Sequence, residues 1–366
     1  MTGRSELLGL TRDDLTAYLE AMGQPPFRGR QIHSWIYERC EDSFFAMSDL
    51  PKSLRHQLDQ QARVTFPMVV KNRVSRDSTR KMLLELEDKK RIECVLIPNN
   101  QEKNQFTICV SSQVGCPLGC VFCATGQGGY QRNLQLPEIL GQILVGEREL
   151  RKKIKNIDDN IRAITNVVFM GMGEPLANYD NLIEAIHIIN DYYGINIGQR
   201  HITISTAGIP NKIRELANEG LQVTLAISLH AADDATRSQL MPINRRHGLQ
   251  DLMTAVDYYI DKTGRRVTFE YILIRGINDQ ERDAANLVRL CRQRLVNVNL
   301  IPYNPVLDLP YESPDPQGVH WFAARLQENG VNAVVRQEHG SDIEAACGQL
   351  KALDDRQRTR LSTRRS

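Results

Sequence analysis

Between about residues 105 and 336, short apolar runs alternate with stretches of helical periodicity. The apolar runs are rich in β-branched residues and have the length of strands. The predicted strands are Phe106–Val110, Asn166–Met170, His201–Ser205, Thr224–Ser228, Val267–Leu273, Val298–Pro302 and Ala333–Arg336. Helical stretches separate most of them, and such alternation predicts a parallel sheet. Six or seven strand–helix units indicate an α/β fold with a full or partial (β/α) barrel, and a doubly wound open sheet is the alternative.

Two of the predicted helices carry clear local signals. Leu182, Ala185, Ile186 and Ile189 have the spacing of one helix face. Another helix is expected to begin at Leu136, because Pro137 then lies in its first turn.

The segments outside this alternation have different patterns. Residues 1–60 are expected to be helical, with a break at Leu50-Pro51, and Pro25 to Arg30 is predicted to be a turn that carries Arg28 and Arg30. Residues 64–100 alternate apolar and polar side chains, which predicts a small antiparallel sheet. We therefore expect four regions, which are an N-terminal helical accessory domain (1–60), a β-rich connector (61–104), the barrel (105–340) and a C-terminal segment (341–366).

Composition limits the choice of partners. The 366 residues are 41% hydrophobic, enough for a full core. The 46 basic and 44 acidic side chains nearly cancel, so the net charge of +2 gives no case for nucleic acid. Basic residues do gather in the last twelve positions, where they form either a solvated tail or a phosphate contact. These residues are Arg356, Arg358, Arg360, Arg364 and Arg365.

No apolar run reaches the length of a membrane span, and Met1 to Glu20 lacks the apolar core of a signal peptide. We expect a cytoplasmic protein with no membrane partner. The cytosol keeps thiols reduced, so the eight cysteines need another explanation than structural disulfides. Four of them lie between positions 109 and 123, which points to metal or redox chemistry.

The strongest motif is Cys116-Pro-Leu-Gly-Cys120-Val-Phe-Cys123, directly after a predicted strand. Three thiolates within eight residues can hold three corners of a cubane [4Fe–4S] cluster. The fourth iron then has an open position, where S-adenosylmethionine (SAM) could chelate. A structural zinc site is the alternative, but such sites usually pair two C-x2-C knuckles, and the spacing here is typical of radical SAM enzymes.

Several polar residues follow the predicted strands and would meet at the C-terminal rim of a barrel. Gly171-Met172-Gly173-Glu174-Pro175 allows close backbone approach to the amino group of SAM, with Glu174 as a partner for its charge. Ser205, the run Ser228-Leu229-His230, and Asn304 could bind its ribose and carboxylate. Taken singly, each is more simply an ordinary polar residue at a strand end.

Cys347 lies near the C-terminus, in a segment where Ser341 and Glu344 have the spacing of a capping box. A short helix is therefore expected there, and burial in that helix is the simplest explanation of the cysteine.

Taken together, the motifs resemble the RlmN/Cfr group of radical SAM RNA methyltransferases. The resemblance covers nearly the whole chain. It is carried by the cysteine triplet and by Cys109-Val-Ser-Ser-Gln-Val-Gly-Cys116, Gly171-Met-Gly-Glu-Pro, Ser228-Leu-His, Ile301-Pro-Tyr-Asn304-Pro and Asp342-Ile-Glu-Ala-Ala-Cys347-Gly-Gln-Leu.

This resemblance implies a covalent relay to an adenine ring carbon. Cys347 would take a methyl group from one SAM, and a radical made from a second SAM would activate that group for addition to the base. Cys109 would then form a transient disulfide with Cys347 and release the product, with Glu93 as proton acceptor. The resemblance also assigns the cluster to Cys116, Cys120 and Cys123. It assigns SAM binding to Gly173, Glu174, Ser205, Ser228, Leu229, His230 and Asn304.

The same resemblance implies the partners. One branch of the group methylates C2 of an adenosine in the peptidyl-transferase centre of 23S rRNA, and of the tRNA adenosine just 3′ of the anticodon. The other methylates C8 of the same rRNA adenosine. Gly173 to Leu176 and Phe269-Glu270-Tyr271 favour the C2 branch. We expect a monomer that takes electrons from a flavodoxin or ferredoxin. The N-terminal helical unit with Arg28 and Arg30, and the arginine-rich tail, are the expected RNA contacts. Cys40, Cys94 and Cys291 match no motif.

Two other classes remain open. One is a radical SAM enzyme acting on a substrate other than RNA, and the other is a zinc-stabilised RNA-binding module without catalysis. Both leave Cys109 and Cys347 unexplained.

Overall fold

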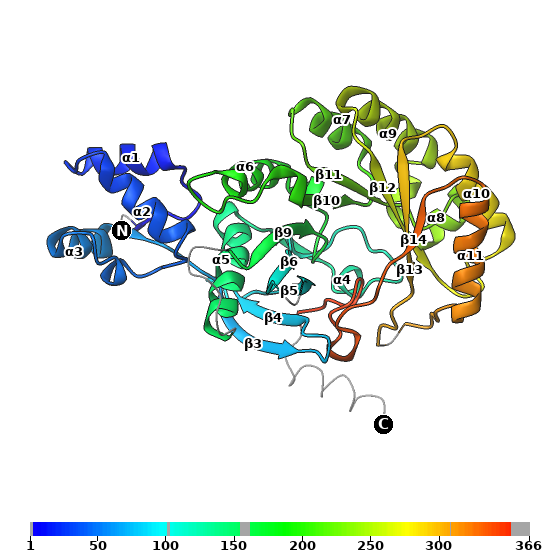
Figure 1. Ribbon diagram of the computed structural model, residues 1–366, viewed down its shortest axis with the longest axis horizontal. Coiled ribbons are helices and arrows are strands. Elements are labelled where there is room, and N and C mark those ends of the chain that lie inside the picture. Colours follow the sequence, from blue (N-terminus) through cyan, green and yellow to red (C-terminus); the bar gives the residue numbers. More distant parts are fainter. Residues whose placement is uncertain (1–2, 101–102, 154–161, 308, 353–366) are drawn as a thin grey trace.

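The computed structural model describes residues 3–100, 103–153, 162–307 and 309–352. Its main feature is one ten-stranded sheet with the strand order β14-β13-β12-β11-β10-β9-β6-β5-β4-β3 (Figure 1). Seven neighbouring strands of this sheet are parallel. These are β6 (Gln105–Cys109), β9 (Ile164–Phe169), β10 (Ile202–Thr206), β11 (Thr224–Ser228), β12 (Val267–Leu273), β13 (Val296–Pro302) and β14 (Ala333–Val335).

Helices make the crossovers that parallel strands require. They are α5 (Leu136–Lys153), α6 (Tyr179–Asn190), α7 (Pro210–Asn218), α8 (Asp234–Leu240), α9 (Leu249–Thr263), α10 (Glu281–Cys291) and α11 (Pro316–Glu328). The predicted α/β class with a partial (β/α)6 barrel is confirmed. The face of α6 predicted from its spacing is fully buried, and α5 begins at Leu136 as expected.

The antiparallel strands predicted between residues 64 and 100 are present as β3 (Met68–Val74), β4 (Arg80–Glu85) and β5 (Arg91–Asn100). They extend the main sheet, because β5 pairs antiparallel with β6. Lys81 lies opposite Val95, and Val95 lies opposite Cys109. Side chains directly opposite one another lie on the same face of a sheet, so this register places all three on one face.

The N-terminal helices lie at one end of the molecule, away from the parallel strands β12 and β13 (Figure 1). They are α1 (Arg12–Ala21), α2 (Phe27–Tyr37) and α3 (Lys52–Gln61), and the break at Leu50-Pro51 is confirmed. The turn predicted from Pro25 to Arg30 is wrong, because α2 begins at Phe27 and contains both arginines. Pro26 is the N-cap of this helix, a place where the missing N–H of proline does no harm. Two short strands, β1 (Ser5–Glu6) and β2 (Ala62–Arg63), pair beside these helices.

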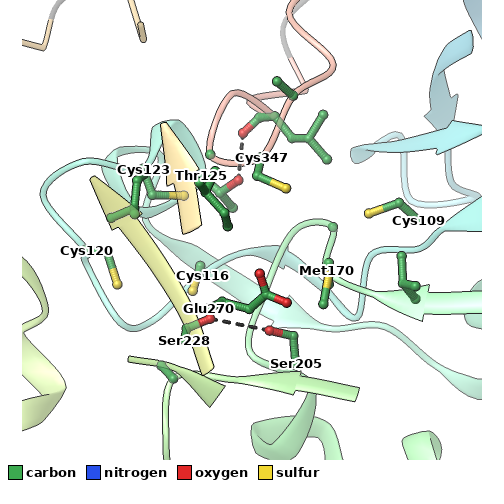
Figure 2. Close-up of a pocket in the computed structure, with 18 of the residues that line it drawn as sticks. Cys109, Cys116, Cys120, Cys123, Thr125, Met170, Ser205, Ser228, Glu270 and Cys347 are labelled. Carbon is green, nitrogen blue, oxygen red and sulfur yellow. Dashed lines mark hydrogen bonds between the residues drawn. The ribbon is translucent and has the colours of Figure 1, made fainter. Parts of the chain in front are cut away.

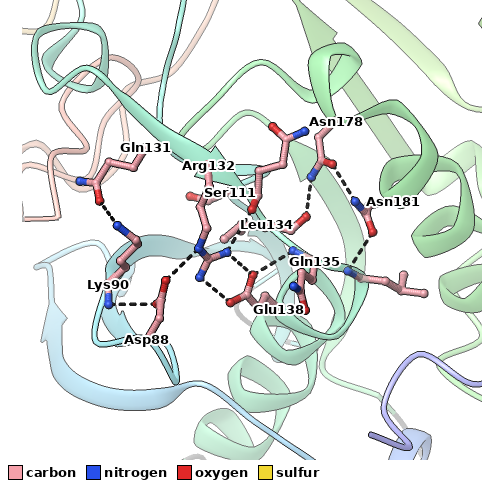
Figure 3. A network of polar contacts seen from close by, with 12 residues as sticks. Asp88, Lys90, Ser111, Gln131, Arg132, Leu134, Gln135, Glu138, Asn178 and Asn181 are labelled. Atoms are coloured by element: carbon pink, nitrogen blue, oxygen red, sulfur yellow. Dashed lines mark hydrogen bonds and ion pairs between the residues drawn. The ribbon is translucent and has the colours of Figure 1, made fainter.

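A polar network fixes the hairpin that encloses the cysteine triplet. The hairpin consists of β7 (Gln113–Gly115) and β8 (Tyr130–Asn133), with the short helix α4 (Ala124–Gln127) between them. Arg132 binds both carboxylate oxygens of Glu138 at 2.7 and 2.8 Å, and Asp88 at 2.9 Å (Figure 3). Such two-pronged charged contacts fix direction as well as distance, so the hairpin is tied to both α5 and the β4–β5 turn.

The segment before Cys347 differs from expectation. Ser341–Ile343 forms only a single 3-10 turn, and no side chain caps it, so the predicted capping box is wrong. Glu344 has a φ of 54°, which ends any helix at that point. Contacts with distant elements hold the segment before Cys347, and they outweigh its local helical signal. The arginine-rich tail falls outside the described residues.

None of the helices described combines the length and the apolar character that a membrane crossing needs.

Candidate active site

A cavity of about 180 Å³ opens at the C-terminal ends of the parallel strands, where a barrel of this type holds its chemistry. It gathers most of the site residues predicted from sequence. Those that line it are Cys109, Cys116, Cys120, Cys123, Gly173, Glu174, Ser205, Ser228, His230 and Cys347. Residues more than two hundred positions apart therefore share one space.

Three predicted site residues lie just outside the cavity wall. Leu229 is fully buried between Ser228 and His230. The side-chain amide of Asn304 donates to the carbonyl oxygen of Cys347 at 3.3 Å. Glu93 is on β5, two residues before Val95, which lines the cavity. Since alternate residues of a strand share a face, Glu93 lies on the side of the sheet that faces the site.

The cysteine triplet occupies the loop between β7 and α4, and Cys123 is the N-cap of α4. All three thiols are partly exposed to the cavity (Figure 2). Burial raises the pKa of Cys116 to about 12, so its thiol stays protonated unless a cationic group binds it. Within the described ranges no three ligating side chains converge on a point where one metal ion could sit. Three thiols from one loop that line a single cavity are a donor set that can bind three irons of a cubane cluster.

Cys109 and Cys347 lie on the other side of the cavity, and Figure 2 shows their sulfur atoms pointing toward one another. Both are free thiols. Cys109 ends β6, and burial raises its pKa to about 12. The guanidinium of Arg336 lies beside the two thiols, and its pKa is raised first by Cys347. This cation opposes part of the effect of burial on the pKa of Cys109.

The loop that carries Cys347 packs directly on the cluster segment. The hydroxyl of Thr125 donates to the carbonyl oxygen of Leu350 at 2.6 Å, and the backbone N–H of Ala124 donates to that of Gly348 at 2.8 Å (Figure 2). Figure 2 shows the Cys347 thiol between the triplet and Cys109, in the same cavity.

The predicted SAM contacts form the floor of the cavity. The hydroxyls of Ser205 and Ser228, at the ends of β10 and β11, are 3.4 Å apart. Glu174 accepts hydrogen bonds from the backbone N–H groups of Ala207 and Leu176, so its carboxylate joins two strand ends. Burial lowers the pKa of His230 to about 3, and its Nδ1 accepts from the N–H of Ile272, so the neutral ring presents Nε2–H as a donor.

Sequence reasoning missed Glu270 as a site residue. Its carboxylate, on β12, is buried against the cavity, and one oxygen accepts from Asn299 at 3.0 Å. The other oxygen has no hydrogen bond among the described residues and lies 3.7 Å from Arg336. The only charged residue inside the mostly apolar run Val267–Leu273 was the signal that could have revealed it.

Comparisons with known proteins agree with this geometry. Residues 110–288 match the model of the radical SAM superfamily, and residues 5–64 match that of the ribosomal RNA large subunit methyltransferase N-terminal domain. The chain is similar to proteins described as probable dual-specificity RNA methyltransferase RlmN. It is 51% identical to that of Syntrophomonas wolfei, over 95% of this chain and 98% of the relative, and 46% identical to that of Thermotoga neapolitana, over 94% and 97%.

A solved structure gives the same result. A radical SAM methyltransferase from Sphaerobacter thermophilus superposes with a TM-score of 0.89 at 42% identity, covering 95% of this chain and all of that one. Radical SAM enzymes use a [4Fe–4S] cluster and SAM, and the three cavity thiols described above fit that cluster. The chain belongs to the RlmN family and is a SAM-dependent radical RNA methyltransferase.

Proposed function

We propose that the enzyme methylates C2 of an adenosine in the peptidyl-transferase centre of 23S rRNA, and of the tRNA adenosine 3′ of the anticodon. The observation that carries this proposal is the pair Cys109 and Cys347, facing one another beside the cysteine triplet. C2 of adenine lies between two ring nitrogens and is electron-poor, so it cannot attack the methyl group of SAM itself. A thiol that first takes the methyl group and a second thiol that releases it solve this problem.

Cys116, Cys120 and Cys123 would hold the cluster, and the cavity floor would hold SAM. That floor consists of Gly173, Glu174, Ser205, Ser228 and His230. Leu229, buried between Ser228 and His230, and Asn304, which donates to the carbonyl oxygen of Cys347, would complete the SAM site. When bound and reduced, the cluster supplies the electron that cleaves SAM.

Cys347 is the methyl carrier in this proposal. Its sulfur attacks the methyl carbon of one SAM, a new sulfur–carbon bond forms, and the sulfonium bond breaks. The guanidinium of Arg336 lies beside this sulfur and lines the same cavity. A second SAM, held in the same cavity, would supply the radical that removes a hydrogen atom from the carried methyl group, and the resulting carbon radical would add to the ring carbon.

Cys109 and Glu93 complete the relay. Glu93 accepts the proton that leaves the ring carbon. Cys109 attacks the sulfur of Cys347, so the sulfur–sulfur bond forms as the bond to the carried carbon breaks. That carbon, which has lost one hydrogen atom, takes up a proton and remains on RNA as a methyl group, and the unpaired electron would return to the cluster. A thiol reductant returns the disulfide to two thiols before the next turnover. A flavodoxin or ferredoxin supplies the electron for the cluster, and the enzyme acts as a monomer.

The test uses anaerobically purified protein, SAM and unmodified RNA transcripts. We expect S-methylcysteine at position 347 in peptide mass spectra, and 2-methyladenosine in digests of the RNA. Cys109→Ala should stay covalently joined to RNA, whereas Cys347→Ala should form neither product. 8-Methyladenosine would assign the enzyme to the other branch, and an unmethylated Cys347 in protein with an intact cluster would refute the relay.

A further inference from the structure

Lys81 is a buried lysine next to the reaction site that the relay leaves without a role. It lies on β4, and its side chain is only 3% exposed. A lysine ammonium is seldom buried without a strong reason, because leaving water is costly for a charge. Its partners are therefore informative.

The ammonium of Lys81 contacts groups on two segments that are far apart in sequence, including the carboxylate of Glu344 at 3.9 Å. It lies 3.4 Å from one carboxylate oxygen of Glu93, and it donates to the backbone carbonyl oxygen of Glu344 at 2.8 Å. Glu344 precedes the methyl-carrying Cys347 by three residues. Lys81 thus joins the proton acceptor to the start of the Cys347 loop.

The other carboxylate oxygen of Glu93 holds the far end of the same loop. It accepts from the backbone N–H of Lys351 at 2.9 Å, four residues after Cys347. The buried Lys81–Glu93 pair therefore anchors the loop on both sides of Cys347. Anchors on both sides leave a short loop little freedom, and they fix the sulfur relative to Cys109 on the neighbouring strand.

The register of the sheet makes these anchors rigid. Glu93 pairs with Leu83 across β4 and β5, and Lys81 pairs with Val95, so Lys81 and Glu93 are diagonal neighbours on one face. Cys109 lies on the same face, opposite Val95. Glu93, Cys109 and Lys81 therefore belong to one hydrogen-bonded sheet, and the Cys347 loop is attached to that sheet.

We propose that Lys81 is a positioning residue, which together with Glu93 sets the place of the Cys347 thiol for both halves of the reaction. The proposal rests on the proposed function, since it presumes that Cys347 carries the methyl group. It gives Glu93 a role in a step that involves no RNA, and a residue that only accepts the ring proton would have no such role.

The test measures the rate at which SAM methylates Cys347 in the cluster-loaded protein without RNA. Lys81→Met keeps the buried stem and removes the ammonium, and we expect the rate to fall on the order of ten- to a hundredfold. Lys81→Arg can still donate to both partners and should restore most of the rate. Lys89→Met is the matched control, because Lys89 is exposed at the β4–β5 turn and contacts only Glu85 in the described structure.

A double variant separates positioning from folding. Lys81→Met removes the cation that lies 3.4 Å from the buried carboxylate of Glu93, which lowers the melting temperature, and adding Glu93→Gln removes the buried negative charge. We expect Lys81→Met/Glu93→Gln to regain the melting temperature and iron content but to methylate Cys347 slowly. If the rate returns together with stability, or if Lys81→Met methylates at the wild-type rate, the proposal is wrong. An unmethylated Cys347 in the wild type would instead refute the proposed function.

Discussion

Gly115 allows a very close approach at the base of the cysteine loop. It has a φ of 76°, and a Cβ placed on it would lie 1.8 Å from the carbonyl oxygen of Gly129. That same oxygen accepts a hydrogen bond from the backbone N–H of Cys116. The first cysteine of the triplet is thus positioned by two glycines that face one another across the hairpin.

We expect Gly115→Ala to destabilise the protein by about 3 kcal/mol, because the methyl group adds a steric clash to a left-handed backbone. The cluster segment would move with it, so iron content should fall as well. Gly129→Ala is the control, since Gly129 also has a positive φ but open space around it, and it should cost only about 1 kcal/mol. Thermal unfolding measures both, and equal losses in the two variants would contradict the close approach.

At the scale of elements, the β3–β4 turn contacts the segment before Cys347 through Asp77. Its carboxylate accepts from the backbone N–H groups of Thr79 and Gly340, and it contacts the ring of His339 at 3.2 Å. Burial raises the pKa of Asp77, but hydrogen bonds from Ser75, Thr79 and Gly340 outweigh it and hold the pKa below the ordinary value of 3.8.

A pH dependence follows from this shift. The folded pKa of Asp77 is lower than the unfolded pKa, so its contribution to stability is complete at neutral pH and declines as pH falls below 3.8. We expect Asp77→Asn to lower the melting temperature at pH 7, with a gap to wild type that shrinks on acidification. Asp261→Asn, on the exposed face of α9, should show no gap at either pH. A gap that widened in acid would contradict the assignment.

How well the sequence predicted each element depended on where its stabilising contacts come from. β11 and β12 have the predicted bounds, because apolar β-branched runs define a buried strand by themselves. The Cys347 segment was predicted to be helical and is a loop, since its partners are Asp77, Lys81 and Thr125, all distant in sequence.

The site residues fall into two groups, those that the sequence revealed and those that it did not. Clustered motifs revealed the triplet and the residues after the strands. Glu270 is the only charged residue of β12, whereas Lys81 is one of three charged residues in β4. The partners of both lie on neighbouring strands or loops. Their importance comes from strand register, which one sequence does not provide.

For the molecule as a whole, the N-terminal helices present Arg30 to solvent at the end opposite α10 (Figure 1). The neighbouring Arg28 differs, because its guanidinium donates to Gln31 and to the carbonyl oxygen of Asp49. The sequence predicts that both arginines contact RNA. In the structure Arg30 is exposed, whereas Arg28 also ties α2 to the following loop.

We expect Arg30→Ala to weaken RNA binding several-fold and to reduce the slope of log affinity against log salt by about one, because one phosphate contact is lost. Methylation of Cys347 without RNA should be unchanged. Arg289→Ala, an exposed arginine on α10, is the control. Filter binding of tRNA transcripts across a salt series measures the slope, and an identical slope in both variants would remove Arg30 from the RNA interface.

The pairing of β5 with β6 also limits how the gene can change. Insertions and deletions that keep the reading frame alter a protein by whole residues, and a one-residue slip turns every side chain of a strand to its other face. Such a slip in β5 would turn Glu93 away from the site, and one in β6 would turn Cys109 away. Insertions and deletions among descendants of this gene should therefore lie outside the paired residues of β5 and β6, even if a protein with a slipped strand could still fold.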